Sequence, residues 1–197
     1  MKIAYCVVTA LLLAACSATE PDTDAAGPAE AFMARIAAHC GEAFEGRMVS
    51  DDDADTDFAR ERLVMHVRKC TDNQIRIPFH VGDDRSRTWV ISRTEEGLRL
   101  KHDHRHEDGS EDAVTQYGGD SAIVTEQRVE FPVDDYSVAL FKREGLTASV
   151  TNVWAMEITE TVFAYELSRE NRFFRVEFDL TAPVPAPPAP WGADEGL

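Results

Sequence analysis

Apolar and polar residues alternate along most of this chain, and this alternation constrains the fold more than any other feature. Residues 75–81 show it clearly, since Ile75, Ile77 and Phe79 are separated by Arg76 and Pro78. Successive side chains of a β-strand point to opposite faces, so a period of two predicts strands with one buried and one exposed face. Strand-like runs recur at residues 63–67, 89–91, 98–101, 123–131, 138–141, 150–158, 163–167 and 174–180.

Short turn motifs separate these runs, among them Gly82-Asp83, Asp108-Gly109 and Gly118-Gly119. Such pairs are typical of hairpin connections, and the intervals leave no room for a helix long enough to join parallel strands. We therefore predict a mainly β domain of about ten antiparallel strands that closes into an up-and-down barrel, because closure removes the exposed edges. A β-sandwich, or a curved open sheet with one helix over its face, is the alternative.

One helix is expected before the strands. It begins at Pro28 or Ala29, and Phe32 and Ile36 recur at the spacing of a helix face. Gly41 is the type of residue that ends a helix. The predicted chain therefore starts with one amphipathic helix, followed almost entirely by strands.

Composition divides the chain into four segments. Residues 1–15 form a signal peptide, and residues 16–28 are polar with two prolines, as in a flexible stalk. Residues 29–181 are long enough for a single domain with its own core. Residues 182–197 carry five prolines, so we expect a disordered, extended and exposed tail.

The net charge of −16 bears on possible partners. Nucleic acids and anionic lipid surfaces attract basic patches, so we expect no nucleic-acid partner. Much of the acidity lies in residues 51–57, which do not match a calcium-binding EF-hand loop. Counted from Asp51, the sixth and twelfth positions are Thr56 and Arg62, where that loop needs Gly and Glu. A solvated loop is the better interpretation.

The N-terminus carries a short export signal. Lys2 is followed by an apolar stretch, residues 3–13, which is too short to cross a bilayer, and then by Leu13-Ala14-Ala15-Cys16. This segment resembles the lipobox of bacterial lipoprotein precursors. The resemblance implies cleavage before Cys16, acylation of Cys16 and a membrane anchor. In that family Ser after the lipidated cysteine, here Ser17, implies delivery to the outer membrane, facing the periplasm or the cell surface.

Two cysteines, Cys40 and Cys70, remain after the lipidated one. An exported protein folds in an oxidising compartment, so we expect these two to form a disulfide. Neither belongs to a Cys-x-x-Cys redox motif. A free reactive thiol is the alternative.

A helix followed by a strand with Phe44-Glu45-Gly46 and a long meander resembles the calycin group of lipocalin-like and fatty-acid-binding-like barrels. The likeness is architectural, because the lipocalin Gly-x-Trp motif is missing: Arg47 and Met48 follow Gly46. Residues 75–119 also resemble a set of uncharacterised exported proteobacterial proteins. That likeness implies no function.

His102, His104 and His106 are the most suggestive polar residues. They continue the alternation of Leu98 and Leu100, so all five would share one face that runs from the core to the barrel rim. Imidazoles two residues apart on a strand can hold zinc, and His102 beside an apolar pocket could bind a haem iron. Hydrogen-bonded rim histidines are the simpler interpretation. Possible further ligands have no predicted position: His66, His80, Glu107 and Asp108.

A barrel interior could also bind a small apolar or amphipathic molecule. Arg85 and Arg87 could present a guanidinium to an acidic group of the ligand, although salt bridges within their hairpin explain them equally well. Neither a Gly-x-Ser-x-Gly nucleophile motif nor a glycine-rich phosphate loop is present in the sequence. The predicted lining is Trp89, Trp154, Phe79, Leu100 and Arg87.

Three functions follow, in descending order of support from the sequence. The first is a non-enzymatic outer-membrane lipoprotein that binds a small hydrophobic ligand in a barrel. The second is a zinc-binding or metal-dependent protein that uses the histidine row. The third is a structural or interaction protein of the cell envelope. The oligomeric state stays open.

Overall fold

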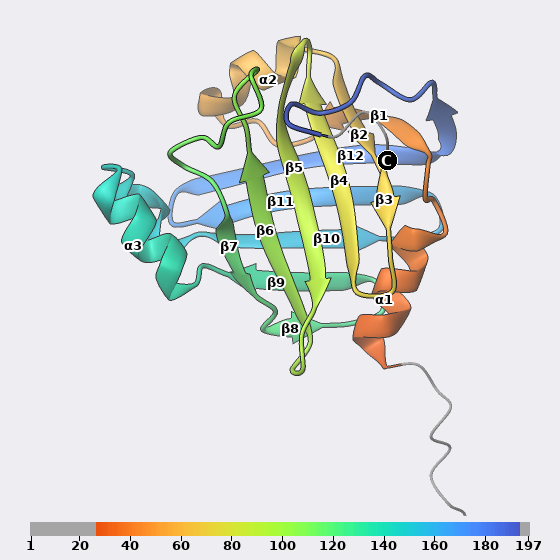
Figure 1. Ribbon diagram of the computed structural model, residues 1–197, viewed down its shortest axis with the longest axis horizontal. Coiled ribbons are helices and arrows are strands. Elements are labelled where there is room, and N and C mark those ends of the chain that lie inside the picture. The colour runs from red at the N-terminus through yellow and green to blue at the C-terminus, as the bar shows by residue number, and fades with distance from the viewer. Residues whose placement is uncertain (1–26, 194–197) are drawn as a thin grey trace, which may run out of the picture.

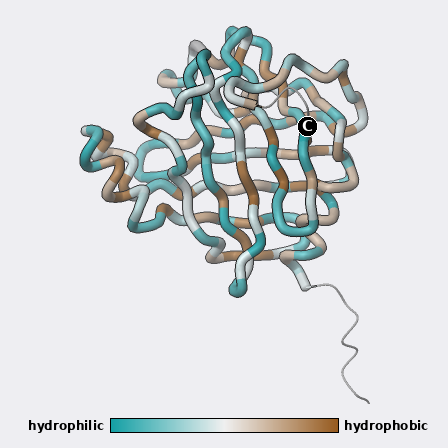
Figure 2. The backbone as a smooth tube through the Cα atoms, viewed as in Figure 1, coloured by the Kyte–Doolittle hydropathy of each residue, from teal (hydrophilic) through white to brown (hydrophobic). Residues whose placement is uncertain are grey.

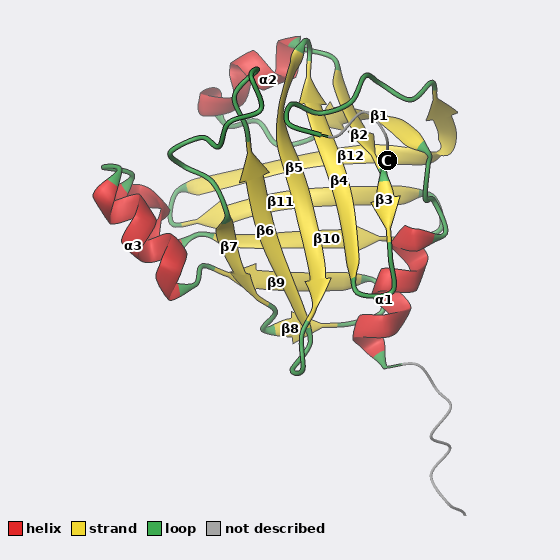
Figure 3. Cartoon of the chain, in the orientation of Figure 1, coloured by secondary structure: helices red, strands yellow, loops and turns green. Residues whose placement is uncertain are grey.

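The computed structural model describes residues 27–193, which form a strongly curled antiparallel sheet with short helices at its margins (Figures 1 and 3). The predicted signal peptide, Cys16 and most of the predicted stalk lie outside the described residues. Within residues 27–193, no helix combines the length and apolar character needed to cross a bilayer.

The sheet contains 12 strands in the described part of the chain, which confirms the mainly β, calycin-like class and exceeds the expected ten by two. Their order across the sheet is β7-β6-β5-β4-β2-β1-β12-β11-β10-β9-β8, and β3 pairs with β4. All pairs are antiparallel. The strands are β1 (Ala43–Met48), β2 (Leu63–His66), β3 (Lys69–Cys70), β4 (Gln74–Val81), β5 (Asp84–Arg93), β6 (Leu98–His104), β7 (Tyr117–Asp120), β8 (Ile123–Val124), β9 (Arg128–Pro132), β10 (Val153–Ile158), β11 (Val162–Arg169) and β12 (Arg172–Val184).

The curled sheet forms two crossing layers. In Figure 1 strands β4 to β7 form the front layer, and β9 to β12 run across behind them. In the middle of this sheet β1 pairs with β12, the first strand along the chain with the last. Figure 2 shows apolar and polar residues alternating along the front strands, as the sequence pattern predicts.

The sheet comes close to closing where β7 approaches the end of β9. The Asp134 N–H donates to the Gly118 carbonyl at 2.9 Å, and the Gly118 N–H donates to the buried Ser137 hydroxyl at 2.8 Å. A Cβ at Gly119 would lie 1.7 Å from the Pro132 carbonyl oxygen. Only glycine permits this approach, so the Gly118-Gly119 pair that predicts a turn in fact makes the seam of the barrel.

Helix α1 (Pro28–Ala37) confirms the N-terminal helix, with Phe32, Met33 and Ile36 buried in the core. It ends four residues before Gly41, whose φ of +91° suits the turn that leads to β1. A disulfide between Cys40 and Cys70, with the Cα atoms 6.2 Å apart, links this turn to β3. The predicted pairing is thus confirmed.

The prediction of one helix is wrong. Residues 138–141 were expected to form a strand, and they lie in helix α3 (Asp135–Arg143). The Asp134 carboxylate caps this helix by accepting from the Ser137 N–H, and Leu140 and Phe141 face the core. The structure also contains α2 (Thr56–Arg60) and two 3₁₀ helices, η1 (Asp53–Asp55) and η2 (Thr147–Thr151).

The predicted tail is exposed or half-buried as far as the structure describes it, but its first three residues, 182–184, belong to a strand. Strand β12 continues to Val184, and Pro183 lies opposite Phe44 beside a bulge in β1, where the ladder is interrupted. Residues 185–193, here called the C-terminal segment, then return to β5. There the Trp191 N–H donates to the Arg85 carbonyl, and the Arg85 side chain donates to the Ala189 carbonyl, both at 3.1 Å.

Candidate ligand-binding pocket

A pocket of about 150 Å³ opens at one end of the space between the two layers. It lies beside η1 and α2, where one end of the front layer meets β11 and β12. We call it the mouth pocket. Its walls come from both layers and both short helices: Asp55, Phe58, Phe79, Arg87, Trp89, His102, His104, Tyr117, Tyr165, Leu167, Arg172 and Phe174.

Aromatic rings form the floor of the mouth pocket. Trp89 stacks on Phe79 with centroids 4.8 Å apart and on Tyr165 with centroids 4.4 Å apart. Phe79 and Trp89 lie on the same face of the sheet. Phe79 pairs with Arg87 and Ile77 pairs with Trp89 across β4 and β5, so the two rings are diagonal neighbours. The three stacked rings are at most 7% exposed, so the floor of the pocket is apolar and tightly packed.

His102 lies behind this floor and is neutral. Its Nδ1 atom lies 3.1 Å from the Tyr117 carbonyl, which can only accept, so Nδ1 carries the proton. Its Nε2 atom then accepts from the Tyr165 hydroxyl at 2.7 Å. Burial lowers the pKa of His102 to about 3 and raises the pKa of Tyr165. Both ring nitrogens are therefore occupied within the protein.

His104 is nearer to solvent. Its Nε2 atom lies 3.1 Å from the Tyr117 hydroxyl. Burial lowers the pKa of His104 to about 4, and the nearby Arg87 guanidinium lowers it further in the same direction. Burial also raises the pKa of Tyr117. Two neutral imidazole–phenol pairs thus give the pocket hydrogen-bonding groups without adding charge.

Two arginines differ in how fully they are neutralised at the rim. Arg172 contacts both oxygens of the buried Asp55 and also Asp52, 3.2 Å away. Arg87 donates through Nη1 to Asp84, and its guanidinium lies 5.4 Å from the centre of the Phe58 ring. Arg172 is thus paired with two carboxylates beside the short helices, whereas Arg87 lines the pocket with one carboxylate partner, Asp84, among the described residues.

The histidine row does not form the predicted metal site. His102 and His104 share the inward face, but His106 lies beyond β6 with 57% of its side chain exposed, and both nitrogens of His102 are engaged. No three His, Cys, Asp or Glu residues between 27 and 193 are placed to hold a metal ion. On the opposite face of β6, which the alternation predicts to be exposed, Asp103 is instead buried and paired with Arg76 and Arg105. The strand ends too early to bring the three imidazoles together.

The haem interpretation also fails on this geometry. An axial histidine needs a free nitrogen, and Nε2 of His102 is bonded to Tyr165. Pockets for drug-sized ligands are roughly 300–1,000 Å³, so a cavity of about 150 Å³ leaves no room for a porphyrin.

The predicted ligand-binding residues divide into two groups. Phe79, Trp89 and Arg87 line the mouth pocket. Trp154 and Leu100 do not: they are buried in a packed core behind it. The interior between the layers is therefore filled with side chains, and a small pocket lies at one end of it.

Sequence reasoning missed half of the pocket. Tyr165 lies in an alternating run with Phe163 and Leu167, so its inward orientation was readable from the sequence. Phe174 begins the alternating run of residues 174–180, so its inward orientation was readable as well, whereas Arg172 precedes that run and reaches this end through the register of β11 with β12. Phe58 belongs to a helix of five residues, too short for its periodicity to be recognised.

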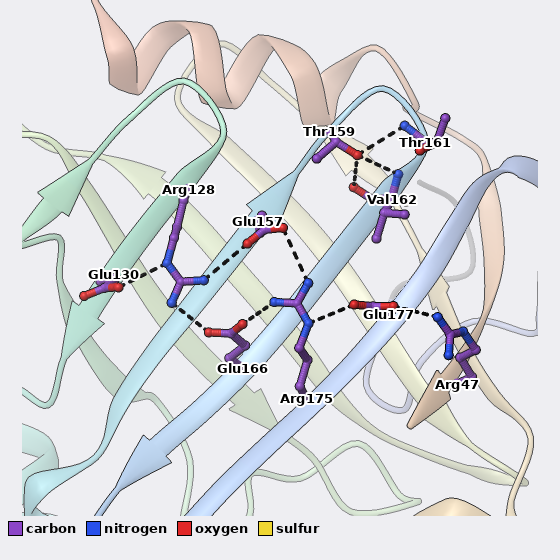
Figure 4. A network of polar contacts seen from close by, with 10 residues as sticks. All are labelled: Arg47, Arg128, Glu130, Glu157, Thr159, Thr161, Val162, Glu166, Arg175 and Glu177. Carbon is purple, nitrogen blue, oxygen red and sulfur yellow. Dashed lines mark hydrogen bonds and ion pairs between the residues drawn. The ribbon is translucent and has the colours of Figure 1, made fainter. Parts of the chain in front are cut away.

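A second polar cluster lies on the outer face of the back layer, away from the pocket (Figure 4). Arg128 and Arg175 both bind Glu166, and each also binds Glu157 at 3.4 Å. Burial would raise the pKa of Glu166, but its bonds to the two arginines outweigh that and lower it. Glu130, Glu177 and Arg47 extend the network at both sides. Each of these charges has a partner within the network, which is what a stabilised sheet surface requires.

Comparisons of the chain with protein-family models, curated proteins and solved structures found no match. A functional proposal therefore has to come from the geometry of the site.

Proposed function

We propose that this protein binds one small, flat, amphipathic molecule in the mouth pocket and performs no chemistry on it. The observation that carries the proposal is the contrast between a filled interior and one pocket with an aromatic floor and a cation at its rim. Trp89 and Tyr165 belong to the packed core, where they are 2% and 7% exposed, and they also line this pocket. Such a combination of apolar walls and a few polar groups is typical of small-molecule sites.

The proposed ligand carries an aromatic or similarly planar group and one acidic group. The planar group would lie against the aromatic lining beside Trp89, where contacts with rings add to the burial of apolar surface. The acidic group would face Arg87, whose guanidinium can bind a carboxylate through two parallel N–H groups. A cavity of about 150 Å³ favours a fragment the size of one ring over an intact lipid.

We further propose the setting that the N-terminal sequence predicts: a lipoprotein held in the outer membrane through acyl chains on Cys16, facing the periplasm or the cell surface. Its partners would be the membrane, through the anchor, and the small ligand. Neither proposal depends on the other, because the mouth pocket belongs to residues 55–174 and the anchor to residue 16.

Two probes test the ligand chemistry by isothermal titration: benzoate, with a ring and a carboxylate, and benzyl alcohol, with the ring alone. We expect Arg87→Gln to weaken benzoate binding about tenfold, because it removes a charge-assisted hydrogen bond, and to leave benzyl alcohol unaffected. Trp89→Leu should weaken both. Arg47→Gln is the matched control, since Arg47 pairs with Glu177 on the far layer.

Native mass spectrometry of the exported protein provides an independent test, because a ligand retained from the cell adds its own mass. The proposal fails if neither probe binds, or if Trp89→Leu binds both as well as the wild type does. In that case an interaction role in the envelope becomes the better explanation.

A further inference from the structure

A second hollow of about 300 Å³ lies on the outer face of the front layer, and it is independent of the mouth pocket. Along β5 and β6 the inward residues Trp89 and His102 line the mouth pocket, and the outward residues Thr88 and Asp103 line this hollow. The end of the C-terminal segment, Pro190 to Ala193, forms one wall. We call this site the basic hollow.

Its lining is cationic in a chain with a net charge of −16. Arg68, Lys69, Arg76 and Arg105 line it, with Asp103 as the acidic residue of the lining. Asp103 accepts from Arg76 at 2.6 Å and from Arg105 at 2.8 Å, so one carboxylate serves two guanidinium groups. Arg105 is satisfied, because it also donates to Glu111 and to the Gly109 carbonyl.

Lys69 and Arg76 are less well compensated. They lie directly opposite each other in the pairing of β3 with β4, where like charges repel. Arg76 reaches Asp103 through Nη2, and Lys69 has no acidic partner among residues 27–193. Of these two adjacent cations only Arg76 has a carboxylate partner in the described chain, so an anion bound between them would relieve the repulsion.

Trp191 supplies a further unused donor. Its indole N–H is buried and has no acceptor in the part of the chain that the structure describes. Trp191 lines both the basic hollow and a neighbouring one beside His80, which places its indole ring between two solvent-accessible spaces. A buried donor without an acceptor is uncommon in folded proteins and indicates a missing partner.

We propose that the basic hollow binds a phosphate group, held by Lys69, Arg76 and the indole N–H of Trp191. A phosphate carries close to two negative charges near neutral pH and several acceptor oxygens, which matches two cations and one neutral donor better than a single carboxylate does. Inorganic phosphate and a phosphate monoester share this chemistry. The site is distinct from the mouth pocket and from the aromatic ligand proposed for it.

The test is isothermal titration of the full chain, purified in detergent, with inorganic phosphate and with glycerol 3-phosphate. Lys69→Gln and Arg76→Gln should each weaken binding about tenfold, as expected when one charged contact to the anion is lost. Arg47→Gln removes an exposed charge on the other layer and should change binding less than about twofold. Tighter binding of glycerol 3-phosphate than of phosphate would identify a monoester as the ligand, and the reverse order would identify the free ion.

Two precautions keep the test decisive. Arg76→Gln leaves Asp103 with one partner, so Lys69→Gln, on a two-residue strand, is the variant of choice if Arg76→Gln fails to fold. Asp194 and Glu195 follow Ala193 in the sequence, so the titration is repeated with D194N/E195Q to remove competing carboxylates. The proposal is overturned if neither form binds phosphate at about 10 mM, or if Arg47→Gln weakens binding as much as Lys69→Gln.

Discussion

The two helix-covered ends of the curled sheet are built differently. Figure 1 shows α1 and α2 at opposite corners of the crossed layers. At the α1 end Phe32, Met33 and Ile36 are at most 2% exposed, and the Cys40–Cys70 disulfide lies at the end of this helix. At the α2 end, the residues that cover the interior are polar or half-buried, and a pocket remains.

This difference separates the stabilising end from the binding end. Apolar packing at the α1 end cannot rearrange without exposing large surfaces to water, which fixes that end. The α2 end is held by ion pairs of Asp52 and Asp55 with Arg172 and by one ring, Phe58, against Phe174. Contacts of this kind separate more readily, so a ligand can enter there without unfolding the barrel.

We call the α1 end the sealed end and the α2 end the open end. The largest expected effect on stability is at the sealed end. Phe32→Ala should lower the free energy of unfolding by about 3–5 kcal/mol, because it leaves a cavity where a ring is fully buried. Urea unfolding measures this, and Tyr136→Ala, at a ring 53% exposed, is the control. Binding of benzoate by the folded variant should be unchanged. If affinity falls together with stability, the two ends are not independent.

Removal of the disulfide should have the next largest effect. Cys40→Ser with Cys70→Ser should lower the free energy of unfolding by about 3–4 kcal/mol, since the bridge closes a loop of 30 residues. Thermal unfolding with and without reductant measures the change. The wild type under oxidising conditions should contain no thiol that reacts at Cys70, and rapid alkylation of Cys70 in the folded protein would contradict the bridge.

Sensitivity to pH should belong to the open end. The pKa of His102 is about 3 in the folded protein and about 6.5 in an unfolded chain, so the unfolded chain takes up the proton first as the pH falls. Its contribution is complete above pH 6.5 and declines below it. Between pH 7.5 and pH 5 we expect a loss of about 2 kcal/mol.

The measurement is urea unfolding of the wild type and His102→Gln at these two pH values. We expect His102→Gln to be less stable than the wild type at pH 7.5. The test is how the free energy of unfolding changes with pH, because unfolding of the variant should take up about one proton fewer than unfolding of the wild type. An equal pH dependence in the two proteins would mean that His102 is not buried in its neutral form.

The smallest effect on stability is expected at the ring that covers the pocket. Phe58→Ala should cost about 1 kcal/mol, because Phe58 is half-buried and makes one aromatic pair with Phe174. Stopped-flow binding of benzoate should show faster entry and faster release. A cost like that of Phe32→Ala would show that both ends are sealed alike.

The sequence is informative about the sealed end and poor about the open one. Alternation along residues 75–81 and 98–102 places their inward faces correctly, and the spacing of Phe32 and Ile36 identifies α1. Both signals are local. The pocket depends on register instead: Phe174 contacts Tyr165 because β11 pairs with β12, and Tyr165 stacks on Trp89 because the back layer crosses the front one.

Helix α3 was misjudged for a related reason. Residues 138–141 are short enough to fit either period, and Asp134 with Ser137, which form the cap, favour a helix start that the apolar run concealed. The histidine row shows the reverse case. Its alternation is real, but the strand ends at His104, and no sequence pattern marks that end point.

The position of α1 also sets the direction from which a ligand arrives. The described chain enters the domain at the sealed end, where α1 begins at Pro28, and the mouth pocket lies at the opposite corner. With acyl chains on Cys16, as the sequence predicts, the tether would join the domain at the sealed end and would leave the mouth pocket clear of the anchor. A ligand would then be captured from the aqueous phase, and its uptake would depend on its solubility and not on its partitioning into lipid.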